Sequence, residues 1–402
     1  MSPREQVTSP PAYPFSPVVG LEIDGTYAEL RDRAPVSRVR LPHRGDAWLI
    51  TGYHEFKQMM TDSRFGTAAL TEEDTPRVAP EPQPADMILF KEAPEHTRLR
   101  RLVSLAFTGR RVERLRPYVD KTVDELIDKM IEHGPPLDLI EHFAWPLPVR
   151  VICELLGIPY ARRHRFQHLT DVIFATTAHN REQVVRARGA LYDFLTELIA
   201  ERRHEPTDDL LGAMVQARDD EDRLSESELL NLAFVILVGG HEGTYNQIGN
   251  FTYLLLADRA RFEELRGDAD MVPSAVEEML RFVPLEAHGV FARVAKDEIE
   301  LGDVLIRPGE VVIGVGSSAN RDKAVFDDPD RLNLRRPSNG HVTFGHGAHY
   351  CLGAPLARLE LEIALAALTR RLPTLRLAVP ETELSWKTGF RMRGLNSLPV
   401  AW

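Results

Sequence analysis

The chain has 402 residues, of which 43% are hydrophobic and 27% are charged, and its formal net charge at pH 7 is −11. Such a chain can bury a large core, and its negative charge excludes the overall basic surface that nucleic-acid binding requires. The two cysteines, Cys153 and Cys351, are too few for a disulfide framework and indicate a reducing compartment.

The N-terminal segment, Met1 to Pro17, is polar and rich in proline and contains no apolar signal core. The longest strongly apolar stretch, Leu229 to Val238, is far too short to cross a bilayer. We find no internal repeat and no long linker. We therefore expect a cytoplasmic protein with a flexible N-terminal segment, residues 1–20, and a single domain, residues 21–402.

Helices separated by prolines are the main prediction for the first half of the chain. Ala47 to Thr51 predicts a short strand, and a helix is expected to follow over about residues 53–61. Residues 71–89 are charged, polar and rich in proline, which predicts a mobile loop. Cys153 lies in an apolar stretch, where a cysteine is usually a small buried hydrophobe.

A long helix is predicted next, beginning at the capping box Ser225-Glu-Ser-Glu228 and extending to about Ala257. Its middle is apolar on all sides, which is typical of a helix that runs through the centre of a protein. It contains Gly239, Gly240 and Gly243, and each interior glycine costs roughly 0.8–1 kcal/mol relative to alanine. These glycines predict a local kink or groove, where a large ligand needs room.

The last part of the chain predicts both helices and strands. A second capping box, Ser274-Ala-Val-Glu277, is expected to open a helix that Pro284 ends. Residues 290–315 then predict strands, with a turn at Pro308 and Gly309. The fold class that follows is mainly α with a minor β portion.

Residues 344–353, Phe-Gly-His-Gly-Ala-His-Tyr-Cys-Leu-Gly, place Cys351 in a glycine-rich turn before a helix with Pro355 in its first turn. Glycines allow the backbone to approach a bulky planar ligand, and a helix N-terminus lowers the pKa of a nearby thiol. A thiolate held in this way suits the axial position of haem iron. The alternatives for Cys351 are a buried cysteine without function and the nucleophile of a hydrolase.

This segment resembles the haem-binding loop of the cytochromes P450, the haem-thiolate monooxygenases. It matches the family pattern Phe-x-x-Gly-x-x-x-Cys-x-Gly at every fixed position, including Phe344, Cys351 and Gly353. The resemblance runs from about residue 45 to the C-terminus and is to soluble bacterial members of the secondary-metabolism type. It implies the cytochrome P450 fold, in which a long central helix crosses a haem b whose iron is held by Cys351.

The resemblance also implies roles for charged residues. Glu278 and Arg281 share a helix face and match the Glu-x-x-Arg pair of the family, whose implied role is a buried network that fixes the haem loop. Arg331 is the arginine expected to join that network. The family positions associated with the haem propionates are matched by four residues, His96, Arg100, Arg293 and His349.

The middle of the central helix departs from the family. The pattern small-Gly-x-acid-Thr-Thr/Ser reads here Gly239-Gly-His-Glu-Gly-Thr244, so Glu242 is the implied proton-relaying acid and Gly243 replaces the oxygen-activating threonine. Thr244 does not simply substitute, because one residue rotates a side chain by about 100° around the helix. We therefore predict that ordered water, or a hydroxyl or N–H group of the substrate, delivers protons.

Substrate-facing positions are implied in the loop 65–90, in residues 174–178, on the central helix and in residues 285–290 and 390–392. The individual residues expected there are Val235, Gly239, Glu286, His288, Phe390 and Arg391. Ionisable side chains among apolar ones indicate a substrate with polar groups, such as a peptide or an alkaloid. The alternative is that these side chains point towards solvent.

The chain contains no flavin or nicotinamide domain and no cysteine cluster for iron–sulfur, so a ferredoxin-type donor with its reductase is expected. Its expected docking patch consists of four arginines, Arg98, Arg101, Arg110 and Arg111. We expect an enzyme that uses O2 to hydroxylate a natural-product intermediate, with no nucleic-acid or membrane partner. Three alternatives stay open: oxidative C–C or C–N coupling or ring formation on an aromatic peptide or alkaloid, peroxide-driven oxidation, and a haem protein that only carries electrons or binds a gas.

Overall fold

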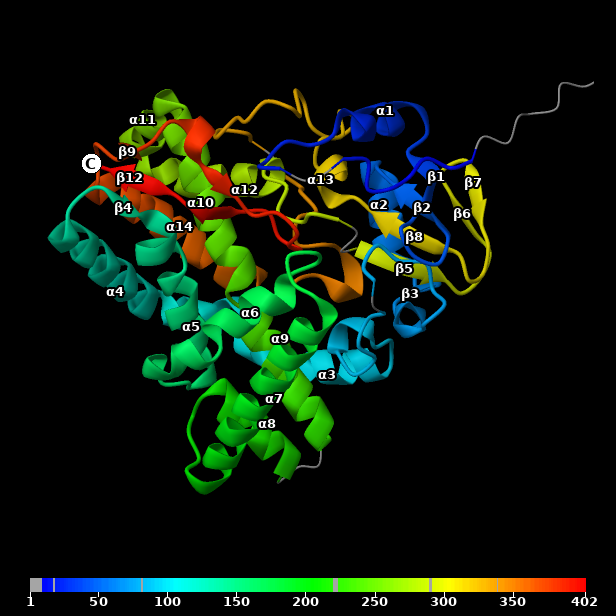
Figure 1. Ribbon diagram of the computed structural model, residues 1–402, viewed down its shortest axis with the longest axis horizontal. Helices are drawn as coiled ribbons and strands as arrows, with labels where there is room; N and C mark the ends of the chain where they lie inside the picture. Colours follow the sequence, from blue (N-terminus) through cyan, green and yellow to red (C-terminus); the bar gives the residue numbers. More distant parts are fainter. Residues whose placement is uncertain (1–8, 17–18, 81, 220–222, 289–290, 338) are drawn as a thin grey trace, which may run out of the picture.

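The computed structural model describes residues 9–16, 19–80, 82–219, 223–288, 291–337 and 339–402. Helices predominate, and Figure 1 shows most of them gathered in one large part, with the main sheet and α1 and α2 at one side. The α-helices of the described residues are α1 (Gly25–Arg33), α2 (Tyr53–Thr61), α3 (Glu95–Ser104), α4 (Gly109–His133), α5 (Pro146–Leu156), α6 (Gln167–Phe174), α7 (Arg181–His204), α8 (Leu210–Asp219), α9 (Glu226–Gly239), α10 (Glu242–Ala257), α11 (Arg259–Gly267), α12 (Val272–Phe282), α13 (Gly316–Ala319) and α14 (Ala354–Arg371).

The strands are short and form one larger sheet and three small ones. They are β1 (Val36–Arg40), β2 (Asp46–Ile50), β3 (Phe65–Gly66), β4 (Leu137–Asp138), β5 (Phe291–Ala295), β6 (Ile299–Leu301), β7 (Val304–Ile306), β8 (Val311–Gly314), β9 (Arg376–Leu377), β10 (Ser385–Trp386), β11 (Leu395–Ser397) and β12 (Pro399–Ala401). The larger sheet has the order β1-β2-β8-β5-β3, and only the β2–β8 pair is parallel. The prediction of a mainly helical fold with a minor β portion is confirmed.

The largest hydrophobic core lies among the long helices, where α14 packs against α4, α10 and α12. Fully buried aromatic side chains such as Phe143 and Phe251 fill it. A separate cluster around Phe56 lies between α2 and the main sheet. The two clusters hold the helical part and the sheet in place on either side of the segment that carries Cys351.

The central helix is divided into α9 and α10 at Gly240 and His241, so the prediction of one continuous helix was wrong and the predicted kink is present. The capping box at Ser225 is confirmed, since its hydroxyl accepts from the N–H of Glu228 at 3.1 Å. Gly240 has a packing reason, because a Cβ there would lie 2.6 Å from the carbonyl oxygen of Ile236.

One other expectation needs correction, whereas the flexibility expected of residues 1–20 stays a prediction. Ser274 does not cap a helix, because α12 already begins at Val272 and the Ser274 hydroxyl donates to the carbonyl of Met271 at 2.9 Å. The described part of the N-terminal segment, residues 9–16, packs on the main sheet through the buried Tyr13, whose N–H donates to the carbonyl of Arg40 at 2.8 Å. Residues 1–8 and 17–18 lie outside the described residues.

The helix at 53–61 and the strand near 47–51 are confirmed as α2 and β2. Residues 71–89 have little regular structure before a short turn of 3₁₀-helix at Ile88–Phe90, and their mobility stays a prediction. Residue 81 and residues 289–290 are not among those described. Within the described ranges, no helix combines the length and the apolar character needed to cross a membrane.

Candidate functional site

Cys351 lies in an irregular loop directly before α14, as the sequence predicts. Its N–H donates to the carbonyl of Phe344 at 2.8 Å, which closes the loop, and Pro355 occupies the first turn of α14. Gly345 and Gly347 have φ angles of +73° and +70°, a region that favours glycine. A side chain at Gly347 would also collide with the backbone of α2. The glycines therefore set the path of the loop.

Cys351 is surrounded by protein and yet has solvent-accessible surface. Desolvation raises its pKa, although the N–H groups of Gly353 and Ala354 and the Arg100 guanidinium act in the opposite direction. The lowering expected from the helix N-terminus is present in the N–H groups of Gly353 and Ala354, but desolvation outweighs it. Cys351 is nevertheless exposed, so its sulfur faces an internal space. A metal cation bound to the sulfur would supply the charge that favours the thiolate. The other cysteine, Cys153, is buried as predicted.

The four residues expected at the haem propionates come together beside this loop. The ring centroids of His96 and His349 are 4.1 Å apart, and the Arg100 guanidinium donates to the carbonyl of Tyr350. Burial and the neighbouring His96, Arg293 and Arg100 lower the pKa of His349 to about 3, and burial lowers the pKa of Arg293 to about 10. None of the four forms an ion pair with an acidic side chain of the described residues. Cations and donors without a counter-ion fit a ligand that carries two carboxylates.

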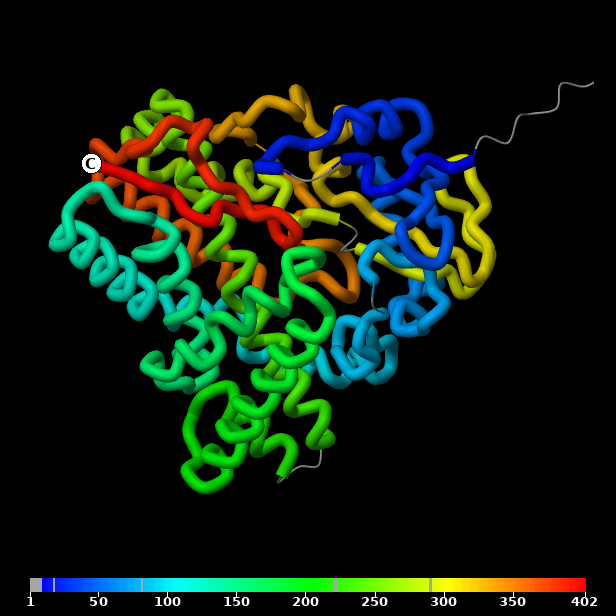
Figure 2. Tube along the Cα trace, viewed as in Figure 1, coloured from blue at the N-terminus to red at the C-terminus, as the bar shows by residue number. Residues whose placement is uncertain are grey.

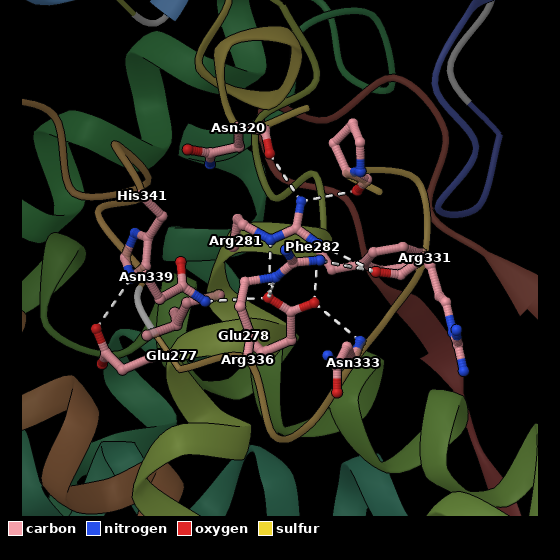
Figure 3. A network of polar contacts seen from close by, with 12 residues as sticks. Glu277, Glu278, Arg281, Phe282, Asn320, Arg331, Asn333, Arg336, Asn339 and His341 are labelled. Atoms are coloured by element: carbon pink, nitrogen blue, oxygen red, sulfur yellow. Dashed lines mark hydrogen bonds and ion pairs between the residues drawn. The ribbon is translucent and has the colours of Figure 1, made fainter. Parts of the chain in front are cut away.

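The Glu278–Arg281 pair is completely buried, with Arg281 Nε 2.8 Å from Glu278 Oε2 and Arg281 Nη2 2.8 Å from Oε1 (Figure 3). The arginine that joins the pair is Arg336, whose Nε donates to Glu278 Oε2 at 2.8 Å. The prediction of Arg331 is therefore wrong. Its side chain is exposed and points away, and only its carbonyl accepts from Arg281 and Arg336.

The carboxylate of Glu278 also fixes the peptide that leads to the cysteine loop. It accepts from the backbone N–H of Asn333 at 2.9 Å and from the side-chain amide of Asn339 at 3.0 Å. Further along, the side chain of Asn320 accepts from the N–H of Val342 at 2.8 Å. The network thus connects α12 with residues 333–342, shortly before Phe344.

One face of the central helix is accessible although the rest of its middle is buried. Val235, Gly239 and Gly243 are four residues apart and form this open face, and a Cβ added at Gly239 would meet no atom within 4 Å. A Cβ at Gly243 would have only Leu285 Cδ2 within that range, at 3.6 Å. Thr244 is buried, so it does not share the environment of Gly243. The open face of the central helix and Cys351 are thus both accessible.

Glu242 is buried and held by side chains that the sequence analysis did not identify. Its Oε1 accepts from the Tyr245 hydroxyl at 3.0 Å and the Asn246 amide at 3.1 Å, and it lies 3.5 Å from Lys387 Nζ. The Lys387 ammonium also contacts the Tyr245 hydroxyl, and burial next to Glu242 raises the pKa of Asp171. Helical spacing indicates Tyr245 and Asn246, whereas no sequence signal points to Lys387.

The kink of the central helix is fixed by His241. Its side chain is buried, with Nδ1 2.7 Å from the carbonyl oxygen of Leu237 and Nε2 3.3 Å from the Thr170 hydroxyl. Burial lowers the pKa of His241 to about 4, so the ring is neutral near pH 7. The His241 ring therefore adds no positive charge beside the open face.

The residues expected to face substrate lie on two segments that run side by side. Glu286 is paired with Met392, and Phe390 with Ala175. Burial raises the pKa of Glu286 to about 7 and lowers the pKa of His288 to about 4. Arg391 is half-buried between these contacts. Both segments border the open face through Leu285.

The four arginines expected to dock the electron donor differ in their contacts. Arg98 pairs with Glu228 at the start of α9 and donates to the carbonyl of Arg223 at 2.7 Å, so it is already engaged. Arg101, Arg110 and Arg111 are exposed. The patch is therefore smaller than the sequence predicts.

Known proteins resemble the chain along almost its whole length. The family described as Cytochrome P450 matches residues 149–385. Nocardicin C N-oxygenase of Nocardia uniformis subsp. tsuyamanensis is 47% identical, with 97% of this chain and 98% of that protein covered. Mycinamicin IV hydroxylase/epoxidase of Micromonospora griseorubida is also 47% identical, with 98% and 99% covered. The crystal structure of HinD with NMFT and NO superimposes with a TM-score of 0.95 at 46% identity, over 98% of this chain and 100% of that chain.

The residues present fit a haem, because the loop carries an accessible cysteine, the four residues beside it have no acidic ion-pair partner among the described residues, and the central helix has an open face. The chain belongs to the cytochrome P450 family and is a monooxygenase of the secondary-metabolism type that binds haem b through a cysteine thiolate.

Proposed function

We propose that Cys351 is the iron ligand and that the enzyme inserts one oxygen atom of O2 into a natural-product intermediate, with electrons from a ferredoxin-type donor and its reductase. Haem supplies the redox-active iron at which O2 is activated. The second oxygen atom leaves as water, which consumes two electrons and two protons. The observation that carries this proposal is the exposed Cys351 in its glycine-rich loop, beside four basic residues that have no acidic ion-pair partner among the described residues. The names of the two relatives, an N-oxygenase and a hydroxylase/epoxidase, support the reaction class.

The protein's own residues hold the haem and keep its loop in place. In this proposal His96, Arg100, Arg293 and His349 donate hydrogen bonds to the two propionates, whose negative charge gives the Arg100 and Arg293 guanidinium groups their counter-ions. Phe344 and Gly353 shape the loop around Cys351, and the Glu278–Arg281–Arg336 network fixes the chain before it. The site is thereby formed before substrate arrives.

Proton delivery follows from the contacts of Glu242. Its Oε1 is occupied by Tyr245, Asn246 and Lys387, while its Oε2 has no hydrogen-bond partner among the described residues. Gly243 offers no hydroxyl and has open space beside it. We infer that a water molecule, or a hydroxyl or N–H group of the substrate, occupies that space and completes the proton path from Glu242.

The ligand assignment is tested on purified holoenzyme with the variants Cys351→Ser and Cys153→Ala. Reduced protein with carbon monoxide is expected to show the red-shifted Soret band of thiolate ligation in the wild type and in C153A, and to lose it in C351S. A thiolate-type band in C351S would contradict the assignment. The electron donor is tested by comparing turnover with a ferredoxin and its reductase against turnover with a flavodoxin.

The absence of a hydroxyl at Gly243 favours a second candidate, oxidative C–C or C–N coupling or ring formation on an aromatic peptide or alkaloid. In that reaction the substrate gives up two hydrogen atoms, the donor supplies two further electrons together with two protons, and O2 is reduced to two molecules of water. Isotopically labelled O2 separates the two outcomes: the label enters the product of hydroxylation and is absent from a coupled product.

A further inference from the structure

Two arginines near the substrate-facing segments have no counter-ion. Arg188 on α7 and Arg391 in the loop after β10 are both half-buried, and the Nε atom of Arg188 is buried without a hydrogen-bond partner. In the part of the chain that the structure describes, neither guanidinium forms an ion pair or a side-chain hydrogen bond. Two nearby cations, in contrast, have partners. Lys387 contacts Glu242, and the Arg393 guanidinium donates to the carbonyl of Glu22.

The packing of α7 against α9 places Arg188 level with the open face of the central helix. Arg203 near the end of α7 lies 2.6 Å from Glu226 at the start of α9, and Tyr192 stacks on Phe234 with ring centroids 4.8 Å apart. The two helices therefore run antiparallel. Arg188 lies one turn before Tyr192 on α7 and is thus level with the last turn of α9. That turn contains the accessible Gly239 of the open face.

The loop of Arg391 approaches the open face from the C-terminal part of the chain, and Figure 2 shows the red C-terminal chain extending to the centre of the molecule. The Arg391 N–H donates to the carbonyl of Phe174 at 2.9 Å, and the carbonyl of Gly389 accepts from the N–H groups of residues 176–178. Two residues later the loop pairs with Leu285, which lies beside Gly243. The loop thus lies between the chain that leads into α7 and the kink of the central helix.

The electrostatics of this arrangement are unfavourable without a ligand. Desolvation, and the charge of Arg188 after it, lower the pKa of Arg391. Two like charges that have lost water and gained no anion raise the free energy of the folded state. An oxyanion between them removes this cost, and the planar fork of a guanidinium matches the two oxygens of a carboxylate.

We propose that Arg188 and Arg391 bind the carboxylate of an acidic substrate, whose uncharged remainder lies along the open face of the central helix. The proposal rests on the proposed function, because it assumes that the open face borders the haem. It narrows the substrate class to small organic acids, including acids derived from amino acids. Glu286 pairs with Met392, so its side chain lies on the same face as that of Met392 and on the opposite face from that of Arg391.

The test measures binding of benzoate and of its neutral isostere benzamide to the holoenzyme by isothermal titration calorimetry at constant ionic strength. The variants are Arg188→Gln and Arg391→Gln. Arg186→Gln is the matched control, because Arg186 lies on the same helix in an exposed pair with Glu182. We expect the wild type and R186Q to prefer benzoate to benzamide, and the benzoate affinity of R188Q and R391Q to fall by at least about tenfold.

Equal benzoate affinity in R391Q and wild type, or no preference of the wild type for benzoate, would overturn the proposal. Inorganic phosphate is titrated in parallel: if it binds as tightly as benzoate and depends on the same arginines, the site holds a free anion and the substrate assignment is overturned. The reduced carbon monoxide spectrum is recorded for each variant. A missing thiolate-type band there refutes the proposed function, whereas the calorimetric comparison still reports on the arginine site.

Discussion

The replacement Arg336→Met isolates the contribution of the arginine that joins the Glu278–Arg281 pair. Arg336 is almost fully buried, and its Nε donates to Glu278 at 2.8 Å while its Nη1 donates to the carbonyl of Asp327 at 2.7 Å. Methionine fills similar volume but leaves the carboxylate with one guanidinium and the carbonyl without a donor. Loss of a partner from a buried ion pair costs about 3–5 kcal/mol, and the remaining Arg281 places the expected loss near the lower end, ~3 kcal/mol.

The matched control is Arg331→Met, because the side chain of Arg331 is exposed and only its carbonyl takes part in the network. An exposed substitution of this kind changes stability by about 0.5 kcal/mol or less. Urea unfolding followed by circular dichroism gives the free energy of unfolding, and the ratio of Soret to protein absorbance gives the haem content. We expect R336M to lose stability and haem, and R331M to retain both. Equal losses in the two variants would refute the assignment of Arg336.

Three further predictions concern the central helix and the surface of α12. Gly243→Thr is expected to leave product per electron unchanged or lower it, because the substrate or water already completes the proton path; better coupling without loss of rate would contradict this. Lys387→Met leaves Glu242 buried without its cation and is expected to cost about 3–5 kcal/mol of unfolding free energy, whereas the exposed Lys323→Met is expected to have little effect. A neighbouring histidine and arginine lower the pKa of Glu277 from 4.5 to about 2. Its stabilisation is therefore complete above pH 4.5 and lost as the pH falls towards 2, and this part of the acid sensitivity is expected to be absent from Glu277→Gln.

The parts of the site that local patterns specify were predictable from the sequence. The glycines and Cys351 lie within ten residues, and Glu278 and Arg281 are three apart on one helix, so spacing alone brings them together. The glycines of the central helix predicted the kink, because several glycines rarely persist inside one straight helix. The resemblance to the cytochromes P450 supplied the fold around these patterns.

Contacts between distant segments were not predictable in the same way. Arg336 and Arg331 both follow the same irregular stretch, and only the folded path of the backbone decides which guanidinium reaches Glu278. Lys387 reaches Glu242 from the position directly after the short strand β10, and nothing in its neighbours along the chain indicates burial. The net direction of the Cys351 pKa shift could not be predicted, because desolvation depends on packing that the sequence does not display.

The carbonyl of Gly389 accepts three consecutive N–H groups, those of Thr176, Thr177 and Ala178, at 2.7, 3.1 and 3.2 Å. A single acceptor shared in this way fastens the connection before α7 to the C-terminal loop, so the two move as one unit. A Cβ at Gly389 would lie 2.6 Å from the Thr177 hydroxyl, which leaves glycine as the residue that fits. The position of Arg391 therefore depends on residues 176–178. In protein engineering, remodelling these residues to admit a larger substrate also displaces Arg391.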